Sequence, residues 1–199
     1  IAAIIILSPA IIPITIILRL TGEGEVFFRQ SRVGKNRINF KLLKFATMLK
    51  NSENIGAGTV TLKDDFRVLP VGKFLRKTKL NELPQLFNIL LGHMSVIGPR
   101  PLHNKQFSFY LPEDQDIIAS TTPGLSGVGS IVFRDEEKIL QNSEDPDSTY
   151  KLQITPEKAI LEKWYISNKS LFLYFKLIIL TIMAILLPKK DMKVFFKGL

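Results

Sequence analysis

Apolar residues gather at both ends of the 199-residue chain. Residues 1–18 read IAAIIILSPAIIPITIIL and carry no charge, whereas residues 170–187 read SLFLYFKLIILTIMAILL and include one charge, on Lys176. A helix over the first stretch would be roughly 27 Å long, and the hydrocarbon core of a bilayer is about 30 Å thick. The pattern therefore predicts a membrane-inserted helix at the N-terminal end.

Two prolines, Pro9 and Pro13, interrupt this N-terminal stretch. Each removes a backbone donor and clashes with the preceding turn, so we expect a kink, and Ser8 can hydrogen-bond a carbonyl that the kink frees. A kinked helix that enters and leaves the bilayer on the same face is favoured, with a membrane-crossing helix as the alternative. A cleavable signal peptide is disfavoured, because no small-residue cleavage site follows and Arg19 leads into a sequence typical of a folded domain.

The C-terminal apolar stretch differs from the first because of Lys176. A charge inside the segment argues against a simple span, whereas a lysine on an interfacial helix can extend its ammonium group toward water. A core helix of the soluble body is the alternative. The chain begins at Ile1 without methionine, so we expect the native N-terminus to lie upstream.

Between the two ends the pattern predicts an α+β fold, a small and mainly helical domain with short strands. The helix expected over residues 81–91 would begin with Asn81 as its N-cap and bury the face that carries Leu83, Phe87 and Leu91. The expected strands cover residues 26–30, 39–45, 94–97 and 127–133; the other expected helices cover 70–77, 105–111, 113–120 and 151–167; and 51–63 is expected to be a loop.

Composition narrows the classes of partner. The net charge is +9, which favours anionic partners such as phospholipid head groups, phosphorylated substrates or nucleic acid. The chain has no cysteine, which excludes a disulfide framework and a thiolate metal site, and it has only two histidines. Aromatic residues accompany the basic segment over residues 26–45, so a nucleic-acid-binding module is one alternative. The two apolar ends argue against this alternative, because a soluble nucleic-acid-binding module does not need them.

Three positions carry candidate chemistry. Glu82 lies in the first turn of an expected helix after a basic run, where a carboxylate can stabilise the helix or face a phosphate-bound divalent cation. Arg100 stands between two prolines that fix the backbone, which suits phosphate recognition as well as a simple turn. Arg134 and Asp135 follow an expected strand, and a surface salt bridge is the plainer interpretation of that pair.

The run KTKLNELPQLFNILLGHMSVIGPRP, over residues 77–101, closely resembles the bacterial sugar transferases. These are monotopic polyprenyl-phosphate phosphoglycosyl transferases. The resemblance extends over essentially the whole chain and includes Ser8-Pro9, FFRQSRVG at 27–34, KFATM at 44–48, PGLSG at 123–127, and Arg134.

The resemblance implies transfer of a sugar 1-phosphate from a nucleoside-diphosphate sugar to undecaprenyl phosphate, with Mg²⁺, as the first membrane step of polysaccharide or glycan assembly. It implies that Glu82 is the catalytic and magnesium-binding carboxylate, that Arg100 and Arg134 hold phosphate or nucleotide, and that Lys44 supports the phosphate site. Asp135 is counted with the substrate-binding residues. Ser8 and Pro9 would break the membrane helix.

The same resemblance implies an architecture and a location. We divide the chain into a kinked re-entrant membrane helix over residues 1–20 and a catalytic domain over residues 21–199 with an interfacial amphipathic C-terminal helix. The body is expected on the cytoplasmic face of the bacterial inner membrane, in contact with phospholipid and not with nucleic acid. A homodimer is kept open beside a monomer.

Three positions depart from the family pattern. Asn81 stands where the nucleophilic Asp is usual, and a neutral amide cannot form a phosphoryl-carboxylate intermediate. Ala46 replaces a cation and His93 replaces an acid; the acid usual before Tyr165 is here Glu162, a milder change. We favour a divergent subgroup that uses another carboxylate, such as Glu82 or Asp135, or direct transfer between bound substrates. An engineered trap at Asn81 and a silent homologue that recruits glycosyltransferases are the alternatives.

Overall fold

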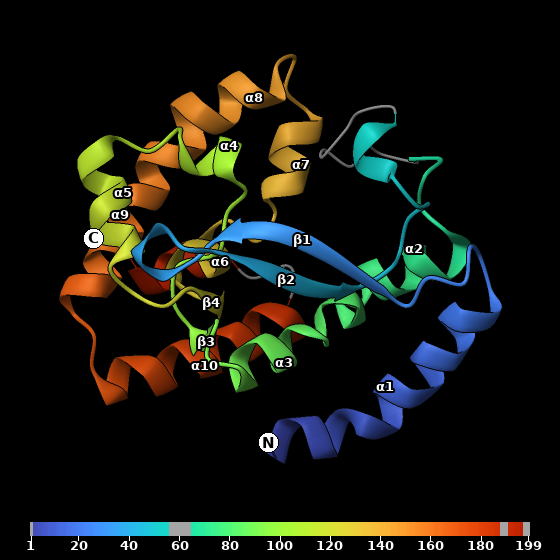
Figure 1. The fold of residues 1–199 in the computed structure, drawn as a ribbon. Coiled ribbons are helices and arrows are strands. Elements are labelled where there is room, and N and C mark those ends of the chain that lie inside the picture. Colours follow the sequence, from blue (N-terminus) through green and yellow to red (C-terminus); the bar gives the residue numbers. More distant parts are fainter. Residues whose placement is uncertain (1, 56–64, 188–190, 197–199) are drawn as a thin grey trace. The chain divides into compact units, whose positions relative to one another are not determined.

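The computed structural model describes residues 2–55, 65–187 and 191–196. Its contacts divide the chain into two compact units, which we describe one at a time (Figure 1). The first unit comprises Ile1–Gln30 and Lys41–Leu91, and the second comprises Ser31–Phe40 and Gly92–Leu199. The described chain is mainly helical with four short strands, which confirms the α+β class.

The first unit packs helices around one end of a two-stranded sheet. Its elements are α1 (Ala2–Leu20), η2 (Ser52–Asn54), α2 (Pro70–Lys77), η3 (Leu80–Glu82) and α3 (Gln85–Leu90), with parts of strands β1 (Phe27–Val33) and β2 (Asn39–Phe45). A short turn, η1 (Lys35–Arg37), joins the two strands in the second unit. The core of the first unit is formed by Ile14 and Leu18 of α1 with Phe45 and Leu75. The N-terminal helix is therefore held to the folded body through one of its faces.

Helix α1 contains both Pro9 and Pro13 and continues through them. Figure 1 shows the axis of α1 changing direction along its length, as expected for a helix with internal prolines. The side chains of Ile12, Ile16 and Leu20 are more than half exposed, although they are apolar. Among the residues that the structure describes, no helix is both long and apolar enough to cross a membrane.

The region around Asn81 differs from the sequence-based expectation. The expected single helix over residues 81–91 is a 3₁₀ turn, η3, followed by the short helix α3, whose first residue comes after Pro84. Asn81 lies inside η3 and makes no cap, so the predicted N-cap is wrong. The expected apolar core face is only partly right: Leu83 packs against the core of the first unit, whereas Leu91 is exposed and the polar Gln85 and Asn88 are buried.

The second unit contains a parallel pair of three-residue strands surrounded by helices. Strands β3 (Ser95–Ile97) and β4 (Gly124–Ser126) pair with Ser95 opposite Gly124 and Ile97 opposite Ser126. The helical elements are α4 (Asn104–Phe107), α5 (Pro112–Ala119), α6 (Val128–Val132), α7 (Glu136–Gln141), α8 (Pro146–Thr149), the π-helical turn η4 (Tyr150–Ile154), α9 (Thr155–Ser167), α10 (Leu171–Leu186) and η5 (Met192–Phe196).

The strand predicted over residues 127–133 is wrong, since this segment is helix α6. Its partner strand explains the difference. The amide of Gly98 donates to the Ser126 carbonyl at 2.8 Å, and the next residue, Pro99, has no amide to extend a ladder. The β pairing therefore stops at Ser126, and the chain turns into a helix after an extended Gly127.

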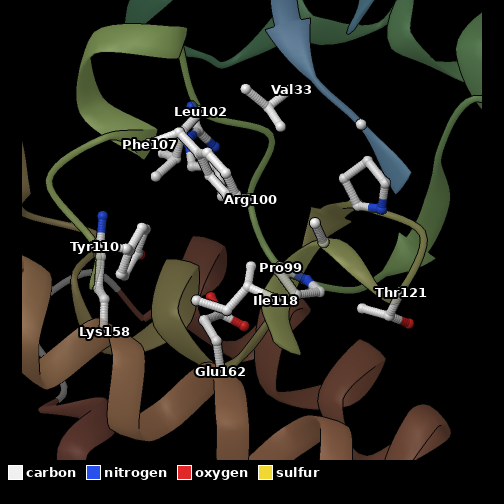
Figure 2. A pocket seen from close by; sticks show the side chains of 13 residues that line it. Val33, Pro99, Arg100, Leu102, Phe107, Tyr110, Ile118, Thr121, Lys158 and Glu162 are labelled. Atoms are coloured by element: carbon white, nitrogen blue, oxygen red, sulfur yellow. The ribbon is translucent and has the colours of Figure 1, made fainter. Parts of the chain in front are cut away.

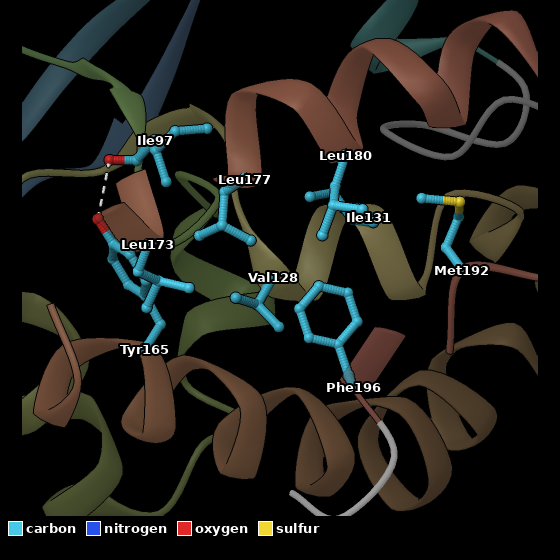
Figure 3. Close-up of a cluster of buried hydrophobic side chains, with 9 residues drawn as sticks. All are labelled: Ile97, Val128, Ile131, Tyr165, Leu173, Leu177, Leu180, Met192 and Phe196. Carbon is cyan, nitrogen blue, oxygen red and sulfur yellow. Dashed lines mark hydrogen bonds between the residues drawn. The ribbon is translucent and has the colours of Figure 1, made fainter. Parts of the chain in front are cut away.

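Helix α10 completes the largest core cluster of the second unit (Figure 3). Its residues Leu173, Leu177 and Leu180 are buried with Val128 and Ile131 of α6. Burial of a leucine side chain stabilises a fold by about 1.5–3 kcal/mol. The opposite side of α10 is apolar yet exposed, with side chains that include Leu171, Phe172, Phe175, Ile179, Ile182 and Leu186. The helix is therefore a core helix on one side and an uncovered apolar surface on the other.

Candidate active site

Glu82 lies at the end of a tight turn in the first unit. The turn begins after Lys79, whose backbone adopts the left-handed conformation with φ 59°, and the Glu82 amide donates to the Lys79 carbonyl at 3.1 Å. The carboxylate Oε1 is 4.0 Å from Nζ of Lys44. The two side chains are 18% and 17% exposed, so this ion pair is largely shielded but still reached by solvent.

Lys44 is presented by strand β2, and a buried amide fixes this strand. Asn88 of α3 accepts a hydrogen bond from the Leu43 amide at 2.9 Å and donates one to the Lys41 carbonyl at 2.8 Å. The Asn88 side chain is 1% exposed. It therefore replaces a missing neighbouring strand for this part of β2 and holds the segment that carries Lys44.

Asn81, adjacent to Glu82 in sequence, is buried with 7% exposure. Its Oδ1 atom has no hydrogen-bond partner. Buried polar atoms are usually paired, and an unpaired one costs about 1–3 kcal/mol. An acceptor without a donor beside the acidic residue of the turn is the kind of atom that a ligand or a cation would satisfy.

Arg100 lies in the second unit on the turn that follows β3. The backbone of this turn is fixed by contacts with β4, because the Gly124 amide donates to the Pro99 carbonyl at 2.8 Å. The glycines pack closely here: a Cβ on Gly124 would lie 2.1 Å from the Gly98 nitrogen. Arg100 itself is exposed while Pro99 and Pro101 on either side are buried. A rigid turn thus carries an accessible cation.

Two buried ionisable residues of helix α9 lie near this turn (Figure 2). Lys158 and Glu162 are 4% and 3% exposed and line a small cavity, partly open to solvent, together with Arg100 and Tyr110. Burial raises the pKa of Glu162 to about 7, against the opposing effects of Lys158 and of the backbone amides of Gly129 and Arg100. Burial lowers the pKa of Lys158, and its ion pair with Glu136 opposes that shift.

Arg134 and Asp135 occupy a different part of the second unit. The Arg134 guanidinium donates to the carbonyls of Ala184 and Leu187, at 2.9 and 3.3 Å, and so satisfies the C-terminal end of α10. It also pairs with Asp135 at 3.5 Å. Asp135 accepts a hydrogen bond from Lys138 at 2.8 Å, and this bond is the main reason why the pKa of Asp135 is lowered. The expected salt bridge is present, and Arg134 also supports a helix end.

The part of the chain that the structure describes holds no group of three or more His, Asp or Glu side chains able to bind a metal ion. Mg²⁺ does not require such a group when it binds a phosphorylated substrate, since one or two protein oxygens, water and phosphate oxygens complete its shell. The Glu82 carboxylate and the unpaired Asn81 amide oxygen fit that donor set. The turn is thus compatible with a magnesium ion bound together with substrate.

The structure pairs some of the predicted site residues with one another. Asn81, Glu82 and Lys44 lie in the first unit, where Lys44 pairs with Glu82. Arg100, Arg134 and Asp135 belong to the second unit, on two separate segments. Ser8 and Pro9 lie within α1.

The sequence-based list of site residues did not include Lys158 and Glu162. Their spacing of four residues on a helix is that of an ordinary exposed ion pair, so the pattern alone gives no signal for burial. The apolar residues Ala159 and Tyr165 are buried on the same face of α9, so Lys158 and Glu162 belong to the face that packs against the rest of the unit.

Comparison with known proteins gives one consistent result. The family model described as bacterial sugar transferase matches residues 1–188. A UDP-glucose:undecaprenyl-phosphate glucose-1-phosphate transferase of Klebsiella pneumoniae is 35% identical over 185 residues, which are 90% of this chain and 36% of that protein. A UDP-N-acetylgalactosamine-undecaprenyl-phosphate N-acetylgalactosaminephosphotransferase of Aeromonas hydrophila is 36% identical over 92% of this chain and 41% of that protein.

A shorter relative matches over most of its own length. The exopolysaccharide production protein ExoY of Rhizobium meliloti is 31% identical over 201 residues, which cover 94% of this chain and 81% of that protein. The chain thus spans less than half of the two transferases above and most of the ExoY protein. Matches of this extent identify the chain as a member of the bacterial sugar transferase family.

Proposed function

We propose that the protein transfers a sugar 1-phosphate from a UDP-sugar to undecaprenyl phosphate, releasing UMP. The observation that carries this function is the shielded Glu82–Lys44 pair on a turn beside the unpaired Asn81 oxygen. A carboxylate and an ammonium group in such a partly buried site suit the binding of a phosphate-bound cation and of the phosphate itself. The activities named for the Klebsiella and Aeromonas relatives support the same reaction class.

The reaction is a phosphoryl substitution. A phosphate oxygen of undecaprenyl phosphate forms a bond to the β-phosphorus of the UDP-sugar, and the bond from that phosphorus to the bridging oxygen breaks, so that UMP leaves with the electron pair. Lys44 and Arg100 offset negative charge on the phosphates. Glu82, with the Asn81 amide oxygen, would hold Mg²⁺. When bound, the ion neutralises charge on the diphosphate.

Asn81 defines the mechanism within this proposal. A carboxamide cannot form the acyl phosphate through which a nucleophilic carboxylate would act. We therefore favour direct attack by the lipid phosphate, with Glu82 as the alternative nucleophile. Mass spectrometry of protein incubated with a UDP-sugar alone separates the two routes, because a sugar-phosphate adduct forms on Glu82 only in the second.

The variant Asn81→Asp tests the role of this position. A carboxylate placed there is expected to form a sugar-phosphate adduct on residue 81 that is absent from the parent protein. Peptide mapping identifies the modified residue, and Asn39→Ala, at an exposed position of β2, serves as the control. An active Asn81→Asp enzyme with no adduct on residue 81, even on rapid quenching, would argue that this position has no covalent role.

The location proposed for this activity is the cytoplasmic face of the bacterial inner membrane. It is supported by the exposed apolar residues of α1 and by those of α10, each considered within its own unit. Lys176 is exposed among the apolar residues of α10, as a lysine that reaches toward head groups would be. Flotation with liposomes of bacterial phospholipid tests this membrane association. A Phe172→Asp/Phe175→Asp variant is expected to lose flotation.

The activity itself is tested with detergent-purified protein, undecaprenyl phosphate and a panel of UDP-glucose, UDP-galactose and UDP-N-acetylgalactosamine. UMP release with at least one donor, dependent on Mg²⁺ and on the lipid phosphate, is the expected result. Folded protein that releases no UMP with any donor would refute the transferase. The alternative of a silent scaffold finds no support in the names of the relatives.

A further inference from the structure

Glu162 is a buried carboxylate of the second unit that lacks a full set of hydrogen-bond partners. It is 3% exposed on α9, and its Oε2 atom has no hydrogen-bond partner. Burial of a carboxylate is costly unless hydrogen bonds and nearby positive charge compensate for the lost contact with water. Its remaining contacts therefore indicate why an acid stands here.

Those contacts are made with backbone amides. The Gly129 amide of α6 and the Arg100 amide of the turn after β3 both act on the Glu162 carboxylate as hydrogen-bond donors. Lys158, one helical turn away, supplies positive charge from the same side. Figure 2 shows Glu162 directed from α9 toward the Pro99–Arg100 segment. The carboxylate thus joins helix α9, helix α6 and the Arg100 turn.

Gly129 shows that the fit is close. A Cβ at this position would lie 2.4 Å from Glu162 Oε1 and 3.3 Å from Glu162 Cδ. Any residue larger than glycine would displace the carboxylate from the amides whose hydrogen bonds it accepts. Because Gly129 has no side chain, the Glu162 carboxylate can occupy the space beside it.

We propose that Glu162 is a positioning residue for Arg100, and that it holds the backbone of the Pro99–Arg100 turn so that the guanidinium meets the diphosphate of the sugar nucleotide. This role rests on the proposed function, which assigns Arg100 to phosphate binding. The β4 contacts fix the turn from one side, through the bond from the Gly124 amide to the Pro99 carbonyl. Glu162 fixes it from the other, through the Arg100 amide.

A double-mutant cycle tests the proposal with Glu162→Gln, Arg100→Ala and the combined variant. Displacement of a positioned binding group is expected to raise KM for the UDP-sugar about tenfold, with KM for undecaprenyl phosphate changed less than about twofold. In the Arg100→Ala background the same change at residue 162 is expected to have almost no further effect, since residues that act through one another are not additive. Glu157→Gln, an exposed glutamate on the same helix, is the matched control.

Two further measurements keep the cycle decisive. Gly129→Ala should reproduce the KM effect of Glu162→Gln and should also lose it when Arg100 is alanine, which covers the case that Glu162→Gln does not fold. Calorimetric titration of each variant with UDP measures the affinity for the diphosphate independently of catalysis. Effects at 162 and 100 that multiply, or no UDP binding by the parent protein, would overturn the proposal. UDP binding without any UMP release would overturn only the proposed function.

Discussion

Two glutamate–lysine sites, one in each unit, use the same residue types in opposite ways. Glu82 lies 4.0 Å from Lys44 in a place that solvent still reaches, on a turn followed by a short helix. Glu162 lies in the interior near Lys158, where its carboxylate accepts hydrogen bonds from backbone amides and its Oε2 atom has no partner. The first environment keeps a carboxylate available to ligands, whereas the second commits a carboxylate to the protein's own backbone. If the proposed roles are right, environment and not residue identity separates a reactive acid from a positioning acid in this protein.

The largest expected effect distinguishes the two acids by rate. Glu82→Gln keeps the shape of the side chain but removes the charge that would hold a phosphate-bound cation. It is expected to lower kcat/KM for UMP release by at least about 100-fold, or about 3 kcal/mol of transition-state stabilisation. Glu162→Gln is expected to change the same quantity only about tenfold. Equal losses for the two variants would break the comparison, and circular dichroism confirms that each variant is folded.

The second expected effect concerns the scaffold of the Glu82 site. Asn88→Ala leaves the Leu43 amide and the Lys41 carbonyl without their partner beside Lys44. The free energy of unfolding is expected to fall by about 2–3 kcal/mol. Urea unfolding in detergent measures it, with Asn39→Ala at an exposed position as the control. A loss below about 0.5 kcal/mol would show that the amide does not support this strand.

The smallest expected effect is a pH trend in stability at Glu162. Its pKa is raised from 4.5 to about 7 by burial, so between these values the folded protein keeps a proton that the unfolded chain has lost. The free energy of unfolding of the parent protein therefore falls as pH rises through this window. Glu162→Gln lacks this titration, and its stability relative to the parent should rise by about 1–2 kcal/mol from pH 5 to pH 8.

Several charged groups face Glu162 and moderate this trend. Lys158 favours the carboxylate through its charge and Arg100 through its backbone amide, Glu136 is paired with Lys158, and the buried Tyr110 and Tyr150 interact electrostatically with Glu162. Thermal unfolding across pH, with Glu157→Gln as the exposed control, provides the measurement. A stability difference between Glu162→Gln and the parent that does not change with pH would contradict a carboxyl that titrates in the interior.

The sequence predicted the elements whose signals are local. The bounds of α2 agree with the expectation for residues 70–77, since Pro70 is well suited to the first helical position and basic residues end the helix. Strand β2 also agrees with the expected range 39–45. The run from Lys77 to Pro101 was enough to indicate the family, and the match over residues 1–188 confirms that family.

The failures share a physical cause, which is tertiary context. The segment 127–133 has strand-like composition, but its partner strand ends at a proline and the segment folds as α6. In α3 the polar Asn88 occupies the interior and bonds β2, whereas Leu90 is exposed. Lys158 and Glu162 resemble an exposed pair because helical spacing does not reveal what covers a helix. The residues 56–63 of the expected loop lie outside the described residues.

The close contact between Gly129 and Glu162 couples the substitutions that two positions far apart in sequence can accept. A methyl group at 129 and the full length of a glutamate at 162 compete for one volume, with only 2.4 Å from the added carbon to Oε1. A shorter aspartate at 162 would withdraw the carboxylate and free room for alanine at 129. Alanine at position 129 should therefore be accepted in related chains only where residue 162 is already shorter than glutamate.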